Sequence, residues 1–138
     1  MSKVLDSWAI LAWLQDEKPA SEHIQDLFDR AETGKIRLLL NLINAGEVYY
    51  RLVRVLSEGA ADAFWKDLKR MPLELVSVTQ TLTIQAARLK GAYPIAYADA
   101  FAAATARKEN SPLVTGDPEL KNLEDICEIE WLERSLIG

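Results

Sequence analysis

The feature of this sequence that most limits its fold is the alternation of short apolar runs with segments of helical periodicity. Strands are predicted at residues 3–6, 36–40, 73–78, 113–115 and 126–131, and helices at 7–15, 19–34, 42–56, 60–71, 79–89 and 96–107. When strands and helices alternate along a chain, the helices act as crossovers between parallel strands. The pattern therefore predicts an α/β fold, with a mostly parallel sheet covered by helices on both faces.

The size and composition of the chain narrow its class. With 138 residues, 49% of them hydrophobic, residues 1–138 are expected to form one domain with a substantial core. The single cysteine, Cys127, excludes an intrachain disulfide and a thiolate metal cage. No apolar leader or membrane-length apolar run is present, so we expect a cytoplasmic protein with no membrane partner. The formal net charge of −5 does not indicate a nucleic-acid binder, although a site built from carboxylates contributes to that total.

Four acidic residues fall where a parallel sheet would bring them together. Asp6 ends the first predicted strand, and Asp117 follows the strand at 113–115 in the stretch LVTGDPEL. Glu47 lies early in the third predicted helix, and Asp99 lies in the first turn of the Ala-rich helix. Ligands of open parallel sheets bind beyond the carboxyl ends of the strands. Four carboxylates at that edge would bind a hard cation, Mg²⁺ or Mn²⁺, through oxygen.

Each of these acids also has a local structural role available to it. Asp6 is a good N-cap for the helix that begins at the next residue. Glu47 is spaced to pair with Arg51 one turn later. Asp99 complements a helix dipole, and Asp117 suits an Asx-turn before a proline. Taken singly, each acid favours its structural role, and only their convergence on one edge favours a site.

Other kinds of catalytic centre have little support. His23 is the only histidine and Cys127 the only thiol, which leaves no basis for a Ser-His-Asp triad or a Cys-His pair, and His23 is expected on the surface. The sequence also contains no GxxxxGK[ST] or GxGxxG loop for nucleotide phosphates. Metal-assisted hydrolysis is thus the chemistry that these residues favour.

Four segments in order, VLDSWAILAWL, NLINAGEVYYRL, YPIAYADAFAAATA and LVTGDPEL, resemble a PIN-domain ribonuclease and are most similar to VapC-type toxins. The resemblance implies a three-layer α/β/α sandwich with strand order 3-2-1-4-5. It implies that Asp6, Glu47, Asp99 and Asp117 are catalytic and bind Mg²⁺ or Mn²⁺. Two hydroxyl residues, Ser7 and Thr115, match positions that support the site.

The resemblance also implies partners: an RNA substrate, a VapB-like antitoxin and a second copy of the chain. RNA is expected to be recognised where its bases are accessible, in single strands or loops. The cations weighed for phosphate contact are Arg51, Arg54, Lys90, Arg107 and Lys108, each of which fits a solvated surface equally well. The apolar residues Trp8, Trp13 and Phe28 are candidates for a partner surface, against the alternative of a buried core helix.

The function that these observations favour is a metal-dependent endoribonuclease acting as the toxin of a toxin-antitoxin pair. One alternative is a nuclease of the same fold that processes RNA without an antitoxin. Another is an RNA-binding protein of this fold that has lost catalysis, which the four intact acids disfavour. A receiver-type phosphoacceptor domain also carries acids at strand ends, but it requires paired acids early in the chain and a late lysine. A short neighbouring reading frame would favour the toxin.

Overall fold

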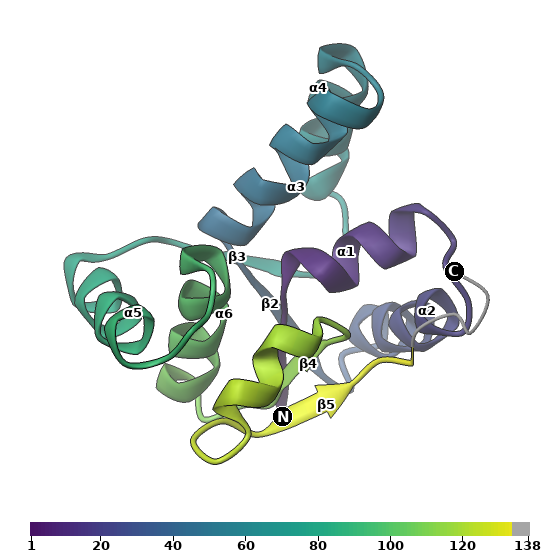
Figure 1. The fold of residues 1–138 in the computed structure, drawn as a ribbon. Helices are drawn as coiled ribbons and strands as arrows, with labels where there is room; N and C mark the ends of the chain where they lie inside the picture. The colour runs from purple at the N-terminus through teal and green to yellow at the C-terminus, as the bar shows by residue number, and fades with distance from the viewer. Residues whose placement is uncertain (134–138) are drawn as a thin grey trace.

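The computed structural model describes residues 1–133, which are built around a five-stranded sheet (Figure 1). The strands are β1 (Ser2–Leu5), β2 (Arg37–Asn41), β3 (Glu74–Val76), β4 (Leu113–Thr115) and β5 (Ile129–Trp131). Their order in the sheet is β3-β2-β1-β4-β5, and every neighbouring pair is parallel. The predicted fold class and strand order are confirmed.

Six α-helices connect these strands. They are α1 (Ser7–Leu14), α2 (Ala20–Glu32), α3 (Leu42–Val55), α4 (Glu58–Leu68), α5 (Gln80–Ala92) and α6 (Tyr97–Lys108), and a 3₁₀ helix, η1 (Pro118–Leu123), precedes β5. Figure 1 shows α5 beside α6 on one side of the sheet, and α1 and α2 on the other, with α3 and α4 forming an arm that extends away. None of the helices in the described residues is long and apolar enough to cross a membrane.

The strands read as continuous apolar runs because both faces of the sheet are buried. Val4 and Leu39 contribute to the core under α5 and α6. Leu5, Leu38 and Leu40 contribute to the opposite core, under α1 and α2. Successive side chains of a strand point to opposite faces, so one run of apolar residues supplies both cores. This double burial fixes the register of β1 and β2. Asp6 directly follows β1, and α3, which carries Glu47, directly follows β2.

Several predicted boundaries differ from the structure by one to three residues, and two of these differences have a clear physical cause. The last strand begins at Ile129 rather than near 126, because the backbone N–H groups of Ile126 and Cys127 both donate to the carbonyl of Leu123 and continue the turn of η1. The fifth helix runs through Gly91 to Ala92 and ends at Tyr93, which adopts an extended backbone. Glycine lowers helix stability by about 1 kcal/mol but does not by itself end a helix.

Of the two alternatives for Phe28, the buried core position is confirmed and the partner surface is not. Its side chain is only 3% exposed and lies in the core under α1 and α2. Trp13 packs edge-on against it, with 4.9 Å between ring centroids, and donates its indole N–H to Gln25 Oε1 at 3.0 Å. Trp8 is also partly buried against this core. The domain thus covers most of the aromatic surface that the sequence left open to a partner.

Candidate active site

The four predicted acids lie at the carboxyl edge of the sheet. Asp6 directly follows β1, and Asp117 lies two residues beyond β4. Glu47 is in the second turn of α3, which follows β2, and Asp99 is the third residue of α6. Asp6 and Asp99 are buried, with 1% and 6% of their surface exposed. Carboxylates held this far from solvent are costly unless they are hydrogen-bonded, protonated or paired with a cation.

Asp6 is fixed by hydrogen bonds at both carboxylate oxygens. Its Oδ1 accepts from the backbone N–H of Ala9 at 2.9 Å, which is the N-cap bond of α1. Its Oδ2 accepts from the Thr115 hydroxyl. Thr115 Oγ1 in turn accepts from the backbone N–H of Asp117 at 3.0 Å. Thr115 therefore links the end of β1 to the turn that carries Asp117, and the capping and site roles of Asp6 coexist.

Glu47 faces the start of α1. Its Oε1 accepts from Ser7 Oγ at 2.5 Å, while Oε2 lies 3.4 Å from both Tyr50 Oη and Arg51 Nη2. The i,i+4 pair with Arg51 is thus present, as the spacing predicted. Because Ser7 directly follows Asp6 in the chain, its bond to Glu47 brings α1 and α3 together at the acid edge.

The carboxylates are close enough to perturb one another. Burial raises the pKa of Asp99 to about 8, and the charges of Asp117, Asp6, Glu119 and Glu47 contribute to that rise. Burial also raises the pKa of Asp6 to about 7, with Asp117 and Glu47 adding to the rise and the bonds from Thr115 and Ala9 opposing it. Both acids therefore bind a proton more readily than a free aspartate, because burial and the neighbouring carboxylates disfavour their charged forms.

The closest group of acids includes Glu119, which the sequence pattern did not single out. Asp99, Asp117 and Glu119 each offer one carboxylate oxygen, and these three atoms lie within 4.8 Å of one another. Glu119 is brought there by η1, whose first turn is capped by Asp117: the Glu119 backbone N–H donates to Asp117 Oδ1 at 2.9 Å. The signal was the spacing in DPE, since a tight turn after Asp117 returns the second acid to the first. An all-oxygen donor set of this kind fits Mg²⁺ or Mn²⁺.

Two buried asparagines, which the sequence pattern also did not single out, hold α3 against α6. Asn44 Nδ2 donates to the carbonyl of Ala98 at 3.0 Å, and Asn41 Nδ2 donates to Thr105 Oγ1 at 3.1 Å. Both asparagines are fully buried. Because Ala98 precedes Asp99 and Asn44 lies one turn before Glu47, these bonds fix the two acids relative to each other.

The predicted phosphate-contacting cations do not gather at this edge. Arg51 is paired with Glu47, and the Arg54 guanidinium lies over the Tyr50 ring, 5.0 Å from its centroid. Lys90 Nζ donates to the carbonyl of Ile95 at 2.7 Å. Arg107 and Lys108 lie in the last turn of α6, at the other end of that helix from Asp99. Of these five cations, Arg51 is the one that the described structure pairs with a site acid.

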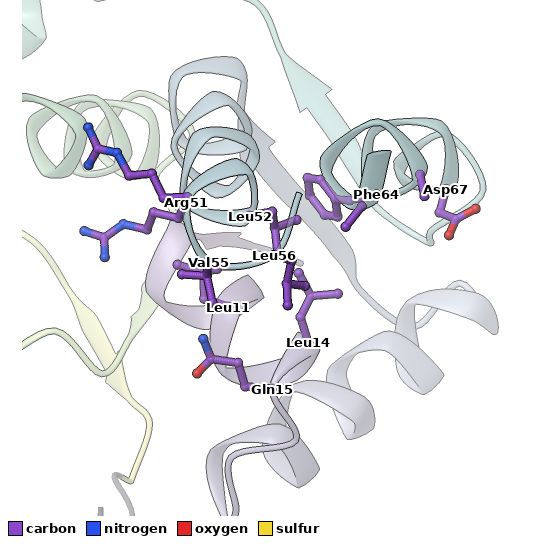
Figure 2. Close-up of a pocket in the computed structure, with 12 residues that line it drawn as sticks. Leu11, Leu14, Gln15, Arg51, Leu52, Val55, Leu56, Phe64 and Asp67 are labelled. Carbon is purple, nitrogen blue, oxygen red and sulfur yellow. The ribbon is translucent and has the colours of Figure 1, made fainter. Parts of the chain in front are cut away.

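An apolar groove lies between α1, α3 and α4 (Figure 2). Its volume is about 630 Å³, and its apolar lining includes Leu11, Leu14, Leu52, Val55, Leu56 and Phe64. Val55 and Leu56 are 73% and 67% exposed, which is unusual for neighbouring aliphatic residues. Figure 2 shows Arg51 on the rim of the groove. The two most exposed aliphatic neighbours of the described residues thus lie at the end of α3, whereas Phe28 is buried.

Gly116, in the turn before Asp117, is required for space rather than for backbone freedom. It is absent from the described positions with positive φ, although a glycine at a strand end suggests unusual dihedrals. A Cβ atom there would lie 2.3 Å from Cη2 of the Trp8 ring. Trp8 therefore packs directly on the backbone that leads from Thr115 to Asp117.

Replacing Gly116 with Ala is expected to lower the stability of the protein by about 1–3 kcal/mol, because the rigid indole has to move. Gly46→Ala is the matched control, since a Cβ there meets nothing within 4 Å in the interior of α3. That variant is expected to melt at or above the wild-type temperature, as alanine favours a helix by about 0.5–1 kcal/mol. Thermal melting of the three proteins checks the prediction, and an unchanged melting temperature for Gly116→Ala would contradict it.

Comparison with known proteins gives a consistent picture. The model of the PIN domain family matches residues 3–126. Similar solved structures include VapBC2 from Rickettsia felis bound to a promoter DNA fragment (TM-score 0.73, 16% identity, covering 96% of this chain and 100% of that chain) and DNA-bound VapBC from Salmonella typhimurium (0.71, 19%, 94% and 97%). Another is VapC20 from Mycobacterium tuberculosis, described as a sarcin-ricin loop cleaving toxin (0.66, 18%, 86% and 92%). No curated protein sequence matches this chain. The strand order, the acids at the carboxyl edge of the sheet and the extent of the family match together show that the chain belongs to the PIN domain family.

Proposed function

We propose that this chain is a metal-dependent endoribonuclease and the toxin of a toxin-antitoxin pair. The observation that carries the proposal is the carboxylate cluster at the sheet edge, in which burial and like charge raise the pKa of Asp99 to about 8. Such a cluster is unfavourable without a cation, and no cation of the described chain is paired with Asp6, Asp99, Asp117 or Glu119. A divalent metal would neutralise the repulsion among these carboxylates and supply the cation that they lack.

We assign the carboxylates of Asp99, Asp117 and Glu119 to metal coordination, together with those of Asp6 and Glu47, whose charges also raise the pKa of Asp99. A bound Mg²⁺ or Mn²⁺ would supply an activated water and stabilise charge on the phosphoryl and leaving oxygens. Thr115 keeps Asp6 oriented, and Ser7 does the same for Glu47. We assign the contact with substrate phosphate to Arg51 and Arg54, as expected from the sequence. Arg51 lies 3.4 Å from Glu47, and Arg54 lies about one turn further along α3.

The assignment to RNA and to a toxin rests on the named relatives. VapC20 is described as cleaving the sarcin-ricin loop, and several other neighbours are toxin-antitoxin complexes. At identities below 20% these structures support the fold, and the acid cluster supports the chemistry. Single-stranded or looped RNA is the proposed substrate, since partly buried carboxylates are more accessible to an unpaired strand than to a regular duplex.

The proposed chemistry is tested by the metal dependence of RNA cleavage. The purified protein is expected to cleave a structured RNA containing single-stranded loops in Mg²⁺ or Mn²⁺, and cleavage should stop in excess EDTA and return when Mg²⁺ is restored. The reason is that the proposed nucleophile is a water activated by the metal, and without the metal the carboxylates have no such water to direct at the phosphate. Cleavage that continues at the same rate in EDTA would rule out this mechanism.

We further propose that an antitoxin segment occupies the groove between α1, α3 and α4. The groove is apolar at its centre and carries Arg51 and Arg54 at one side, so it suits an apolar segment that places an acidic group toward these arginines. The proposed antitoxin-binding surface is therefore this groove and not the aromatic surface around Phe28, which the sequence had left open as a candidate. A second copy of the chain, predicted from the resemblance, remains a prediction.

Val55→Asp is expected to weaken antitoxin binding by at least about tenfold, because it puts an unpaired charge against the apolar wall of the groove. Val55 is 73% exposed, so the melting temperature of the toxin alone should change little. Ile84→Asp is the matched control, since Ile84 is 49% exposed but lies on α5, outside the groove. Co-purification and titration with the product of a short adjacent reading frame measure the effect; equal binding by both variants would place the antitoxin elsewhere.

A further inference from the structure

A second concave site, lined by cations, lies between α5 and α6. It has a volume of about 410 Å³ and is lined by Gln85, Arg88, Leu89, Ala104, Arg107 and Lys108. Leu89 and Ala104 are the apolar residues of its lining, and no carboxylate belongs to it. We call Arg88, Arg107 and Lys108 the basic triad. The tertiary structure brings Arg88 of α5 to the two α6 cations that the sequence had suggested for phosphate contact.

The basic triad is not neutralised by the part of the chain that the structure describes. None of its three members lies within 4.0 Å of a carboxylate there, whereas Lys3, Arg30, Arg37 and Arg51 all do. Arg107 Nη1 is held by the carbonyl of Ile126 at 3.3 Å, which fixes the guanidinium while leaving its remaining N–H groups available. In a chain of net charge −5, three unpaired cations around one pocket do not follow from composition.

The helix dipole explains part of this arrangement but not all of it. Arg107 and Lys108 occupy the last turn of α6, where cations stabilise the helix. Arg88 lies before the last turn of α5, whose terminal cation is Lys90. Its position is therefore not required by the dipole of its own helix. It adds a third exposed positive charge to the lining of the same pocket.

We propose that the basic triad binds the phosphate backbone of single-stranded RNA, as a second contact away from the acid edge; this inference rests on the proposed function. A nuclease whose cleavage site consists of carboxylates repels its polyanionic substrate until metal binds, so the substrate has to be held by cations elsewhere. The basic triad supplies them. Guanidinium groups offer several N–H donors to phosphate oxygens, and Gln85 adds an amide.

The position of the triad fits a strand that reaches the acid edge. Asp99 and Arg107 are eight residues apart on α6, which corresponds to about 12 Å along the helix axis at ~1.5 Å per residue. That axial separation is a minimum, and it already exceeds the ~3.4 Å that one nucleotide step of a stacked strand spans. Figure 1 shows α6 between the sheet and α5, and its residues from Asp99 to Ala106 are buried. A strand that links the acid edge to the triad therefore has to cross the exposed surface around this helix. A dinucleotide bound at the acids is too short to reach the triad.

The test compares the double variant Arg88→Gln/Lys108→Gln with wild type in binding a labelled single-stranded RNA of about 20 nucleotides. Arg107 is left unchanged because of its bond to Ile126. Binding is measured by fluorescence anisotropy in EDTA between 50 and 200 mM KCl. The slope of log K against log[salt] is expected to fall by about 1.4, since each lost single-strand phosphate contact removes about 0.7. Cleavage of a dinucleotide in Mg²⁺ should be unchanged.

Lys18→Gln/Lys35→Gln is the matched control, because both lysines are exposed, flank α2 on the other side of the sheet and remove the same net charge. The control should leave the slope close to that of wild type. Equal slopes for the two double variants would overturn the inference while leaving the nuclease proposal intact. The inference would also be overturned if the wild-type protein cleaved a dinucleotide but did not bind RNA of greater length.

Two further outcomes would overturn the inference in distinguishable ways. If calorimetry shows inorganic phosphate binding that depends on the triad while the RNA slope does not, the pocket is a small-anion site and the RNA assignment is overturned. If the wild type neither binds RNA of any length nor cleaves it in Mg²⁺, the nuclease proposal fails, and this inference fails with it.

Discussion

Replacing Asp99 with Asn is expected to reduce metal-dependent RNA cleavage by at least about 10²-fold. Asp99 offers an oxygen within 4.8 Å of those of Asp117 and Glu119, so the substitution removes one charged donor from the centre of the cluster. A metal stabilises a phosphoryl-transfer transition state by several kcal/mol, and each ~1.4 kcal/mol lost is tenfold in rate. Single-turnover cleavage at saturating Mg²⁺ measures the effect.

The same substitution is expected to stabilise the protein in EDTA. Asp99 is buried, and Asp117, Asp6, Glu119 and Glu47 all raise its pKa. At pH 8 the Asp99 carboxyl is ionised in the unfolded chain. In the folded chain it either keeps its proton against the solution pH or carries a charge that its neighbours disfavour. The neutral amide of Asn avoids both of these free-energy costs. Asp125→Asn, on an exposed acid, is the control and should change neither activity nor melting temperature appreciably. If the Asp99→Asn variant melts lower than wild type in EDTA, or cleaves at the wild-type rate, Asp99 is structural.

The metal-free protein is expected to lose stability as the pH rises from about 4 to about 8. The folded-state pKa values of Asp6 and Asp99 are about 7 and about 8, against an ordinary value of 3.8 for an aspartate. Between these limits the folded state binds protons that the unfolded state has released, so the stabilisation present below pH 3.8 is lost as the pH passes through the folded-state values. The loss grows with each unit of pH across this range, since a tenfold difference in proton affinity between the two states corresponds to about 1.4 kcal/mol.

Added Mg²⁺ should reverse this trend. The ion binds the charged carboxylates, so it raises the melting temperature more at pH 8 than at pH 5. Asp6→Asn keeps a side-chain acceptor for the Ala9 N–H and removes one charge; it should therefore melt above wild type in EDTA and respond less to Mg²⁺. Melting curves at several pH values, with and without Mg²⁺, check all three expectations. Stability that is flat or rising between pH 5 and 8 in EDTA would contradict the clustering of these acids.

Much of the scaffold was predictable because the sequence repeats one local pattern. The apolar runs around Val4, Leu39 and Val114 are short and lie between helical segments, and crossover connections between parallel strands follow from that order. The same order placed Asp6 and Asp117 at strand ends. Boundaries were less predictable where the backbone made bonds that have no signature in composition, as between Cys127 and Leu123.

The local and collective roles of the acids could not be separated from the sequence. Asp6 caps α1 and Asp117 caps η1, as their local roles required, and both also act on the pKa of Asp99. Capping uses one carboxylate oxygen and a backbone N–H two or three residues away, so it is encoded locally. Repulsion among the acids depends on how β1, β4, α3 and α6 meet, and only the folded chain determines that.

By itself, the sequence determined the alternation of parallel strands with helices and the edge at which Asp6, Glu47, Asp99 and Asp117 lie, because periodicity and connectivity act between near neighbours. The spatial order of the strands was implied by the family resemblance alone. Only the tertiary structure decided that Glu119 joins the closest group of carboxylates, that the Trp8 ring rather than backbone conformation requires Gly116, and that Arg88 meets Arg107 and Lys108. The physical reason is packing: each of these contacts is set by how helices dock on the sheet, which depends on the shapes of side chains distant in the sequence.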